Sequence, residues 1–586
     1  MSLKHLSSCL AVCAVWPMLL AGHQTYPSVS APAAPSSPAA VAPKTGKPER
    51  AATEKLLAAS EYGYIVQESL LVSPDHWHVA FISRAMGYSP GSKNWFYVAL
   101  DGKTGPQYDA IVKLSPRFSP DSRRLAYLAR RADKIVAVVD GTEGDSYDLI
   151  ARDSLVFSLD GKHFAYAAGL AGKWFVVRDG LEGAPYDEIA KASLSFSPDG
   201  SHLAYAARLG NDWVVVLDAE EGKQYDEIVA SAPLPGQSEL ALYGGILAAG
   251  LGRYYMNAQA YSQAGTAVSG EAAVYASRGS PVFSPDSQHL AYAAKLSGKK
   301  FVMLDRVESG PYDGIVQDSI TFSKRSSLAY DAKLGDKFFV VLDGKENKTY
   351  DGILEDTPVF SPDGNKLAYV AVSAQKQMVV LDGQEQREYD RIFRLVFSPD
   401  SRHLVYCAQS GQKFRVVLDG HENSAYDQIS DQSLTFSPDS VRLGYFAQAG
   451  AGWMAVVDGN EGDKYEAIAE SSLVFSPGSK RFAYVARQDN KWLVVADEKP
   501  GPPYDRILGA PVFSPDGRGI AYAAGIENRQ FAVLNDKPGN PYDYVLASFD
   551  NQAPEFVRFD SAGAIHYLVE KAYKIYLVEE RQNPSR

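Results

Sequence analysis

The residues that fit a catalytic motif most closely form the segment Gly87-Tyr88-Ser89-Pro90-Gly91. The GxSxG spacing is typical of hydrolases in which the serine lies at a sharp strand-to-helix turn and attacks an acyl carbon. The backbone N–H after the serine must donate a hydrogen bond to the oxyanion. Pro90 has no N–H, and the segment falls in an expected hairpin loop. The sequence therefore predicts no serine hydrolase here.

Histidine recurs two or three residues after an Asp-Gly or Asp-Ser turn, where other copies of the same unit carry Lys or Arg. An exchange between His and a cation indicates a solvated rim rather than a set of metal ligands. His76 and His78 are the exception, but two histidines fall short of the three or four protein ligands that zinc takes. The sequence predicts no metal site and no cofactor. The recurrent histidines are His163, His202, His289 and His403.

Aspartate recurs at two further positions, represented by Asp199 in Ser-Pro-Asp-Gly and Asp187 in Tyr-Asp-Glu-Ile. In turns, an Asp carboxylate accepts hydrogen bonds from nearby backbone N–H groups. A single active site needs one copy of a residue, whereas these aspartates appear in nearly every unit. Both positions are predicted to be architectural.

These residues belong to a unit that repeats about every 39 residues after residue 60. Residues 194–229 represent it: LSFSPDGSHLAYAARLGNDWVVVLDAEEGKQYDEIV. The Phe of FSPD recurs at Phe118, Phe157, Phe196, Phe283, Phe322, Phe360, Phe397, Phe436, Phe475 and Phe513. The Tyr of YDxI recurs in step, at Tyr108, Tyr147, Tyr186, Tyr225, Tyr312, Tyr350, Tyr389, Tyr426, Tyr465, Tyr504 and Tyr542.

Each unit divides into four short strands. The inner strand ends at Phe, Ser-Pro-Asp-Gly forms a β-turn, and LAY begins the second strand. An aromatic–Val–Val run forms the third strand, Asp-Gly turns the chain, and YDxI is expected to be the outer strand. Four strands in about 39 residues are typical of one blade of a β-propeller.

Further copies are placed by their offset from the repeat. Val72, Leu234 and Phe559 mark three divergent inner strands, which makes thirteen blades. The segment Tyr62-Gly63-Tyr64-Ile65 is expected to be an unpaired outer strand, and the chain ends in a third strand, Tyr573 to Val578, that lacks an outer partner. Propellers close by joining strands from distant chain positions.

The predicted fold is all-β, with two tandem β-propellers of six and seven four-stranded blades, because a ring usually holds four to eight. The first propeller is predicted at 51–308, the second at 309–580, and a short tail at 581–586. The outer strands at Tyr62 and Tyr312 are expected to close the first and second ring, respectively.

The N-terminal segment 1–22 is typical of a signal peptide, with Lys4 before an apolar run that ends in small residues. This run is too short to span a bilayer, which needs about 20 residues. A lipid on Cys13 is the alternative. Residues 23–50 form a linker rich in Pro, Ala and Ser, predicted to be disordered, and residues 48–59 are expected to form a short helix. Cys407 replaces an Ala of LAYA and is predicted to be a small buried hydrophobe.

The FSPDG-x-x-LAY pattern resembles the WD-like repeats of the TolB propeller superfamily over most of the chain. The resemblance implies a β-propeller that matches the propeller part of TolB alone, without its N-terminal α/β domain. The DGxEGxxYDxI half of the unit is not part of that resemblance. A TolB partner is therefore not carried over.

The two classes of turn differ in charge. Connections from the third to the outer strand are rich in acids, whereas those from the second to the third strand are basic and lie on the opposite face. Either both faces are solubilising rims, or the basic face is cationic enough to bind a protein, an acidic one above all, or an anionic polymer. Its candidate residues are Arg130, Arg131, Lys134, Lys295, Lys299 and Lys300.

The formal net charge of −12 disfavours nucleic acid as a partner. We predict an exported, non-enzymatic binding or scaffolding protein of the periplasm or cell surface. The alternative is a propeller-fold enzyme, a polysaccharide lyase or hydrolase, with a site in a central pocket. A remnant sensor or receptor domain is a third reading.

Overall fold

The computed structural model describes residues 50–59, 64–65, 69–85, 94–190, 192–229, 281–316, 318–355, 357–550, 553–572 and 574–582. These residues form β-strands, together with one short 3-10 helix, η1 (Arg152–Ser154). The predicted all-β propeller class is confirmed. No helix among the described residues is long and apolar enough to cross a membrane.

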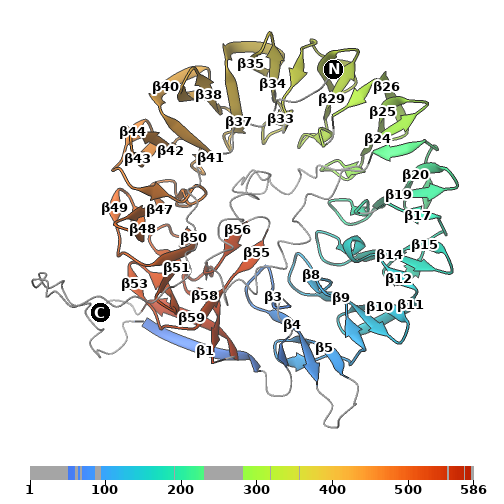
Figure 1. Ribbon diagram of the computed structural model, residues 1–586, viewed down its shortest axis with the longest axis horizontal. Helices are drawn as coiled ribbons and strands as arrows, with labels where there is room; N and C mark the ends of the chain where they lie inside the picture. Colours follow the sequence, from blue (N-terminus) through green and yellow to red (C-terminus); the bar gives the residue numbers. More distant parts are fainter. Residues whose placement is uncertain are drawn as a thin grey trace, which may run out of the picture. The chain divides into compact units, whose positions relative to one another are not determined.

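The strands form twelve blades, each an antiparallel sheet that runs from an inner to an outer strand (Figure 1). The second strands carry the LAY motif. They are β4 (Val79–Ala85), β9 (Leu125–Arg131), β14 (Phe164–Leu170), β19 (Leu203–Leu209), β24 (Leu290–Leu296), β29 (Leu328–Leu334), β34 (Leu367–Ser373), β38 (Leu404–Ser410), β42 (Leu443–Ala449), β47 (Phe482–Gln488), β51 (Ile520–Ile526) and β58 (Ile565–Lys571).

The third strands carry the aromatic–Val–Val run. They are β5 (Trp95–Leu100), β10 (Lys134–Val139), β15 (Lys173–Arg178), β20 (Asp212–Leu217), β25 (Lys299–Leu304), β30 (Lys337–Leu342), β35 (Lys376–Leu381), β39 (Lys413–Leu418), β43 (Gly452–Val457), β48 (Lys491–Ala496), β52 (Arg529–Leu534) and β59 (Lys574–Gln582).

The outer strands follow the Asp-Gly turns. They are β6 (Lys103–Thr104), β11 (Thr142–Tyr147), β16 (Leu181–Glu182), β21 (Glu220–Glu221), β26 (Val307–Tyr312), β31 (Lys345–Glu346), β36 (Gln384–Tyr389), β40 (His421–Tyr426), β44 (Asn460–Glu461), β49 (Lys499–Pro500) and β53 (Lys537–Pro538). The outer strand of the last blade is β1 (Arg50–Ala59), from the start of the described chain.

The inner strands are mostly interrupted into two halves that pair with the same second strand. They are β2 (Tyr64–Ile65) with β3 (Leu71–Val72), β7 (Ala110–Ile111) with β8 (Arg117–Phe118), β12 (Leu149–Ile150) with β13 (Val156–Phe157), β17 (Glu188–Ile189) with β18 (Ser195–Phe196), β22 (Glu227–Val229) with β23 (Val282–Phe283), β27 (Gly314–Ile315) with β28 (Thr321–Phe322), β32 (Gly352–Ile353) with β33 (Val359–Phe360), β37 (Arg391–Phe397), β41 (Gln428–Phe436), β45 (Ala467–Ile468) with β46 (Val474–Phe475), β50 (Arg506–Phe513), and β54 (Tyr544–Leu546) with β57 (Arg558–Phe559). A hairpin, β55 (Ser548–Asp550) and β56 (Ala553–Glu555), interrupts the last of these.

The predicted inner strands at Val72 and Phe559 are confirmed, since both pair with second strands. The prediction that YDxI forms the outer strand is wrong. In Tyr147-Asp-Leu-Ile150, Tyr147 ends the outer strand of blade 2, and Ile150 belongs to the inner strand of blade 3. The motif therefore carries the chain from one blade to the next.

Alternation along the second strands explains how the blades pack. Successive side chains of a strand point to opposite faces of its sheet. In β9, Leu125 and Tyr127 pack toward blade 1, whereas Ala126 and Leu128 pack toward blade 3. Each interface is thus an apolar cluster with large residues from one blade and small residues from its neighbour.

These clusters form one closed series, which differs from the predicted division into rings at 51–308 and 309–580. Twelve clusters join the twelve blades in sequence. One of them runs across the predicted boundary, from Val302 to Ile315 and Phe339. Another joins Phe81 of blade 1 to Leu568 of blade 12. The described blades therefore close as a single ring, and we call the interface of blades 1 and 12 the seam.

The closing strand is β1, so the helix predicted at 48–59 is wrong. Its residues, RAATEKLLAA, are good helix formers, but β1 pairs along β59 from Arg50↔Gln582 to Ala59↔Lys574. The two strands lie side by side in Figure 1. Tertiary pairing outweighs helix propensity here, because β59 would otherwise leave an unpaired edge. The strand at Tyr64–Ile65 belongs instead to the inner strand of blade 1.

Four predictions lie outside the described residues. They are the signal peptide at 1–22, most of the linker at 23–50, the GxSxG segment at 87–91, and the divergent blade that starts at Leu234. The last of these accounts for the difference between the thirteen predicted blades and the twelve described.

Candidate functional site

The Asp of YDxI ties neighbouring blades together, as its recurrence predicts. Asp148 accepts a hydrogen bond from Lys134 of blade 2, with Nζ and Oδ1 2.5 Å apart. Its other oxygen accepts the backbone N–H of Ala171, in the hairpin of blade 3, at 2.9 Å. The Lys134 ammonium and the Ala171 N–H lower the pKa of Asp148. The same pair of contacts recurs at Asp187, Asp313, Asp351, Asp390, Asp427 and Asp505.

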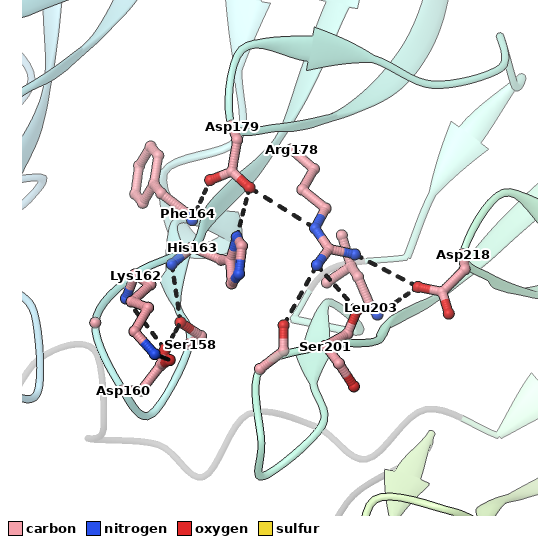
Figure 2. Close-up of polar contacts among 12 residues, drawn as sticks. Ser158, Asp160, Lys162, His163, Phe164, Arg178, Asp179, Ser201, Leu203 and Asp218 are labelled. Carbon is pink, nitrogen blue, oxygen red and sulfur yellow. Dashed lines mark hydrogen bonds and ion pairs between the residues drawn. The ribbon is translucent and has the colours of Figure 1, made fainter.

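The recurrent histidines lie on the opposite face, where Figure 2 shows one of them. Asp179 accepts the backbone N–H of Phe164 at 2.9 Å and meets Nδ1 of His163 at 2.7 Å. His163 also stacks on Phe196 of the next blade, with centroids 6.3 Å apart. The solvated-rim prediction is therefore incomplete, because this side chain is 37% exposed yet clamps two blades.

Where Arg stands at this position, it makes the same clamp. Arg124 binds Asp140 at 2.9 Å, lies over Phe157 and donates to the carbonyl oxygen of Lys162 in the next blade. A flat cationic or aromatic group fits the slot, which explains the exchange between His and Arg.

The acidic connections contribute to the interfaces between blades. Tyr147 donates a hydrogen bond to Glu182 of the next blade at 2.7 Å, and its ring packs edge-on against Tyr166. Burial and the nearby Glu182 carboxylate raise the pKa of Tyr147. The same donation joins Tyr108 to Glu143 and Tyr389 to Glu422. The acids of this face thus join neighbouring blades by accepting hydrogen bonds from buried tyrosines, a role that the sequence pattern does not indicate.

Four of the six candidate basic residues are paired with carboxylates. Arg131 binds Glu143 at 2.6 Å, Lys134 binds Asp148 at 2.5 Å, Lys295 binds Glu227 at 3.5 Å, and Lys299 binds Asp313 at 2.5 Å. The Asp of YDxI lies on the same face as the second-to-third-strand hairpins. The basic character expected from those hairpins alone is therefore partly neutralised. Arg130 and Lys300 lie on β9 and β25 of this face.

The seam carries a polar cluster that no other described interface shares, and we take it as the candidate site. His76 is fully buried and takes the place of Gly or Ser in the Ser-Pro-Asp-Gly turn. Its Nε2 is hydrogen bonded to Ser548 Oγ and lies 3.4 Å from Glu555 Oε2. Both partners belong to the hairpin β55–β56.

His566, on β58, completes the cluster. It is 4% exposed and stacks on Trp77 with centroids 4.7 Å apart. Its Nε2 lies 3.3 Å from the carbonyl oxygen of Asp75, to which the N–H tautomer donates. The two imidazoles are 6.3 Å apart, edge to face.

The electrostatics of the cluster favour a neutral His566 and an ionised Glu555. Burial is the largest effect on His566 and lowers its pKa, and the charges of His76 and Arg558 lower it further. Burial alone would raise the pKa of Glu555, but the hydrogen bond and charge of His76 and the charge of Arg558 bring it below its ordinary value.

Ser548, His76 and Glu555 do not form a catalytic triad. In a triad, the serine meets one imidazole nitrogen and the carboxylate orients the ring through the other. Here both oxygens approach Nε2, while Nδ1 of His76 has no hydrogen-bond partner among the described residues. Ser548 is 1% exposed, so a substrate has no access to its hydroxyl. The arrangement suits a structural junction.

Among the described residues, no three His, Cys, Asp or Glu side chains are grouped so that they could hold a metal ion. The sequence analysis singled out His76 and His78, but the structure separates them. His78 binds Asp101 at 2.7 Å on the rim. Glu555 and His566 were missed because they lie in a divergent unit. The long interval between Tyr542 and Phe559 is the signal that marks the inserted hairpin.

No family model matches the sequence, and no curated protein matches it either. Among solved structures, it is similar to TolB from Acinetobacter baumannii, with 15% identity, 44% of this chain and 61% of that chain covered, and a TM-score of 0.20. It is also similar to the Dos1 propeller, with 12% identity, 50% and 90% coverage and a TM-score of 0.25. A third is the β-propeller domain of the Trilobed protease from Pyrococcus furiosus, with 15% identity, 44% and 91% coverage and a TM-score of 0.22. This chain therefore spans less than two thirds of the TolB structure, and the likenesses concern the fold alone.

Proposed function

We propose that this protein is an exported, non-enzymatic binding or scaffolding module that acts in the periplasm or at the cell surface. Its partner is a protein or an anionic polymer. Export rests on the signal-peptide pattern of residues 1–22. The proposal of binding rests on a contrast between two sets of residues. Residues that recur from unit to unit join neighbouring blades, whereas residues that differ between blades are exposed.

One observation carries the proposal. The recurrent Asp, His, Lys and Tyr side chains hold blade to blade, whereas the residues that differ between blades stand exposed on the turns. Leu159 is 46% exposed at a position where other blades carry Pro, and Leu181 is 77% exposed at a third-to-outer-strand turn. Turns on a rigid scaffold are where binding residues usually lie. Blade 3 thus offers two exposed apolar side chains in the blade that also carries the His163–Asp179 clamp of Figure 2.

The opposite face offers Lys300, at a position where the other blades carry an aromatic residue, Ile or Gln, and Arg130, at a position where several blades carry a cation. Single exposed charges contribute about 0–1 kcal/mol each, so partner binding through this face works by many weak contacts and weakens with salt. Substitutions on the two faces are therefore expected to change partner capture in different ways.

The repeat supplies variants that preserve the fold. Leu159→Pro with Leu181→Thr restores residues that other blades carry on the first face, at Pro120 and Thr142. Arg130→Gln with Lys300→Gln does the same on the second, as at Gln409 and Gln377. Immobilised full-length protein and both variants are incubated with envelope extract at low and high salt, and the captured partners are quantified.

We expect one variant to lose a captured partner while the other keeps it, and salt to weaken capture only where the cationic face binds. Unchanged capture by both variants would contradict binding through either face. Turnover of polysaccharide or ester substrates by the purified protein would contradict the non-enzymatic reading. Mass spectrometry should find a mature N-terminus between about residues 21 and 32, and an intact Met1 in the envelope fraction would contradict export.

A further inference from the structure

The turns next to the seam differ from those at other interfaces in one titratable residue. At five interfaces, the fourth residue of the turn that begins with Ser-Pro is a Ser whose hydroxyl accepts the backbone N–H of an Asp in the preceding blade. Blade 1 carries His76 at this position. The five serine contacts are Asp75–Ser122, Asp199–Ser287, Asp363–Ser401, Asp400–Ser440 and Asp439–Ser479.

His76 fills a position that the fold demands but that suits few side chains. Its φ is +64°, a left-handed conformation that His tolerates better than most residues with a side chain. Instead of reaching a turn of blade 12, it reaches the hairpin β55–β56 through Ser548 and Glu555. The seam therefore replaces a neutral hydroxyl contact with a buried imidazole contact.

His566 lies on the other side of the seam and faces charged groups from several elements. From the turn of blade 1 come His76 and the carbonyl oxygen of Asp75, and from blade 12 come Arg558, Glu555 and Asp560. Arg558 is fixed by donating to the carbonyl oxygen of Pro74 at 2.8 Å. His566 itself is buried, whereas the charged groups around it are partly exposed, so a proton on it would stand in a buried imidazole beside the Arg558 guanidinium.

We propose that the seam is an acid-sensitive latch, in which protonation of His566 loosens the contact between blades 1 and 12 while the other blade interfaces stay closed. The rim histidines lie in a different environment, because they are 37–42% exposed and each meets an Asp carboxylate.

The direction in which pH changes the stability of the closed seam follows from proton linkage. The pKa of His566 in the closed seam lies below its ordinary value of about 6.5. Its contribution to closure is fully present above that ordinary value and is lost as the pH falls below it. Because opening then binds up to one proton, the open population rises as the pH falls from the ordinary value to the lower pKa of the closed seam, by at most about tenfold per pH unit. Glu555 stays ionised in this range, since its pKa lies below that of an ordinary Glu.

Hydroxyl-radical footprinting of the full-length protein tests the latch by measuring side-chain labelling at pH 7.5 and pH 5.5. The seam is reported by Phe81 and Leu568, which are buried against each other's blades. The interface of blades 4 and 5 is reported by Tyr292 and Met303. We expect labelling of the seam residues to rise at the lower pH, by up to about tenfold, and labelling of the other pair to stay constant.

The substitution His566→Gln keeps a donor for the Asp75 carbonyl oxygen but cannot be protonated, so it should abolish the pH response. The matched control His202→Gln alters a rim histidine bound to Asp218 and should leave the response intact. Equal labelling of the wild-type seam at both pH values, or parallel loosening of both interfaces, would overturn the proposal. If His566→Gln fails to fold, the comparison of the two wild-type interfaces still decides it.

Discussion

Tyr542 donates a hydrogen bond to Glu54 across a separation of 488 residues, with the hydroxyl 2.9 Å from Oε1. Lys571 binds the same carboxylate at 3.1 Å. Elsewhere the matching acid comes from the next blade along the chain, as in Tyr147 and Glu182. β1 therefore supplies to the last blade both a strand and an acid like those that Tyr108, Tyr147, Tyr225 and Tyr389 meet in the next blade.

Removing this acid should weaken closure of the ring. Hydrogen bonds to charged groups contribute about 1.5–3 kcal/mol, so Glu54→Ala should lower the free energy of unfolding by about that amount. Urea unfolding followed by circular dichroism measures it. Lys55→Ala changes the exposed neighbour on the same strand and should have little effect. Equal losses from both variants would show that Glu54 has no special part in closure.

The buried tyrosines should resist ionisation. Burial raises the pKa of Tyr166 and of Tyr292 to about 12, and raises that of Tyr147 further. An unfolded tyrosine ionises near pH 10. Ultraviolet titration of phenolate should therefore show a large group of tyrosines that ionises only above about pH 12, together with unfolding. Most tyrosines ionising near pH 10 in the folded protein would contradict the packing described.

Strong acid should unfold the whole ring, in a range separate from the response of the seam. The Asp residues of YDxI have pKa values below the ordinary value, because a Lys and a backbone N–H donate to each. Their contribution is present above the ordinary value of about 3.9 and is lost as the pH falls through the lower folded value. Near-ultraviolet circular dichroism should stay constant down to about pH 4 and then fall steeply.

The contact between Asp148 and Lys134 can be tested separately for its part in acid unfolding. Asp148→Asn weakens the attraction to Lys134 and should lower the thermal midpoint at neutral pH more than at pH 3, where the wild-type carboxylate begins to protonate. Asp145→Asn changes an exposed acid of the same blade and serves as its control. The same loss at both pH values would contradict a role for the ionised form.

Cys407 should be chemically inert in the folded protein. It is 1% exposed, and burial raises its pKa to about 12. Iodoacetamide at pH 8 should therefore modify Cys407 only after denaturant is added. Cys407→Ala, which restores the residue of other copies, should fold normally. Rapid modification of the native protein would contradict the packing between blades 8 and 9.

The repeat predicts much of the fold because each blade obeys the same local rules. The spacing of Phe and Tyr correctly places inner strands as divergent as those at Val72 and Phe559. The role of YDxI is harder to predict, because a short polar motif at a blade boundary pairs with both neighbours. Pairing through Tyr147 and Ile150 depends on the packing of two sheets, which no local pattern records.

The single ring and its seam could not be read from the repeat. An interface between consecutive blades has the same sequence pattern whichever ring it belongs to. The repeat therefore does not show whether the blades form one ring or two. β1 has the composition of a helix, and only its pairing with β59 makes it a strand. His76 enters the sequence analysis only with His78, as two histidines too few for a zinc site, and its contacts with Glu555 and His566 depend on a hairpin that the repeat does not contain.

Cross-linking from Thr53 tests the closure of a single ring most directly. A photoreactive amino acid at this exposed position of β1 is activated in the folded protein, and the attached peptide is identified by mass spectrometry. Closure by β1 predicts cross-links within one chain to 574–582, where Glu579 lies opposite Thr53. Cross-links to 299–304, the third strand of blade 5, would contradict the single ring and show that the N-terminal strand closes a smaller one.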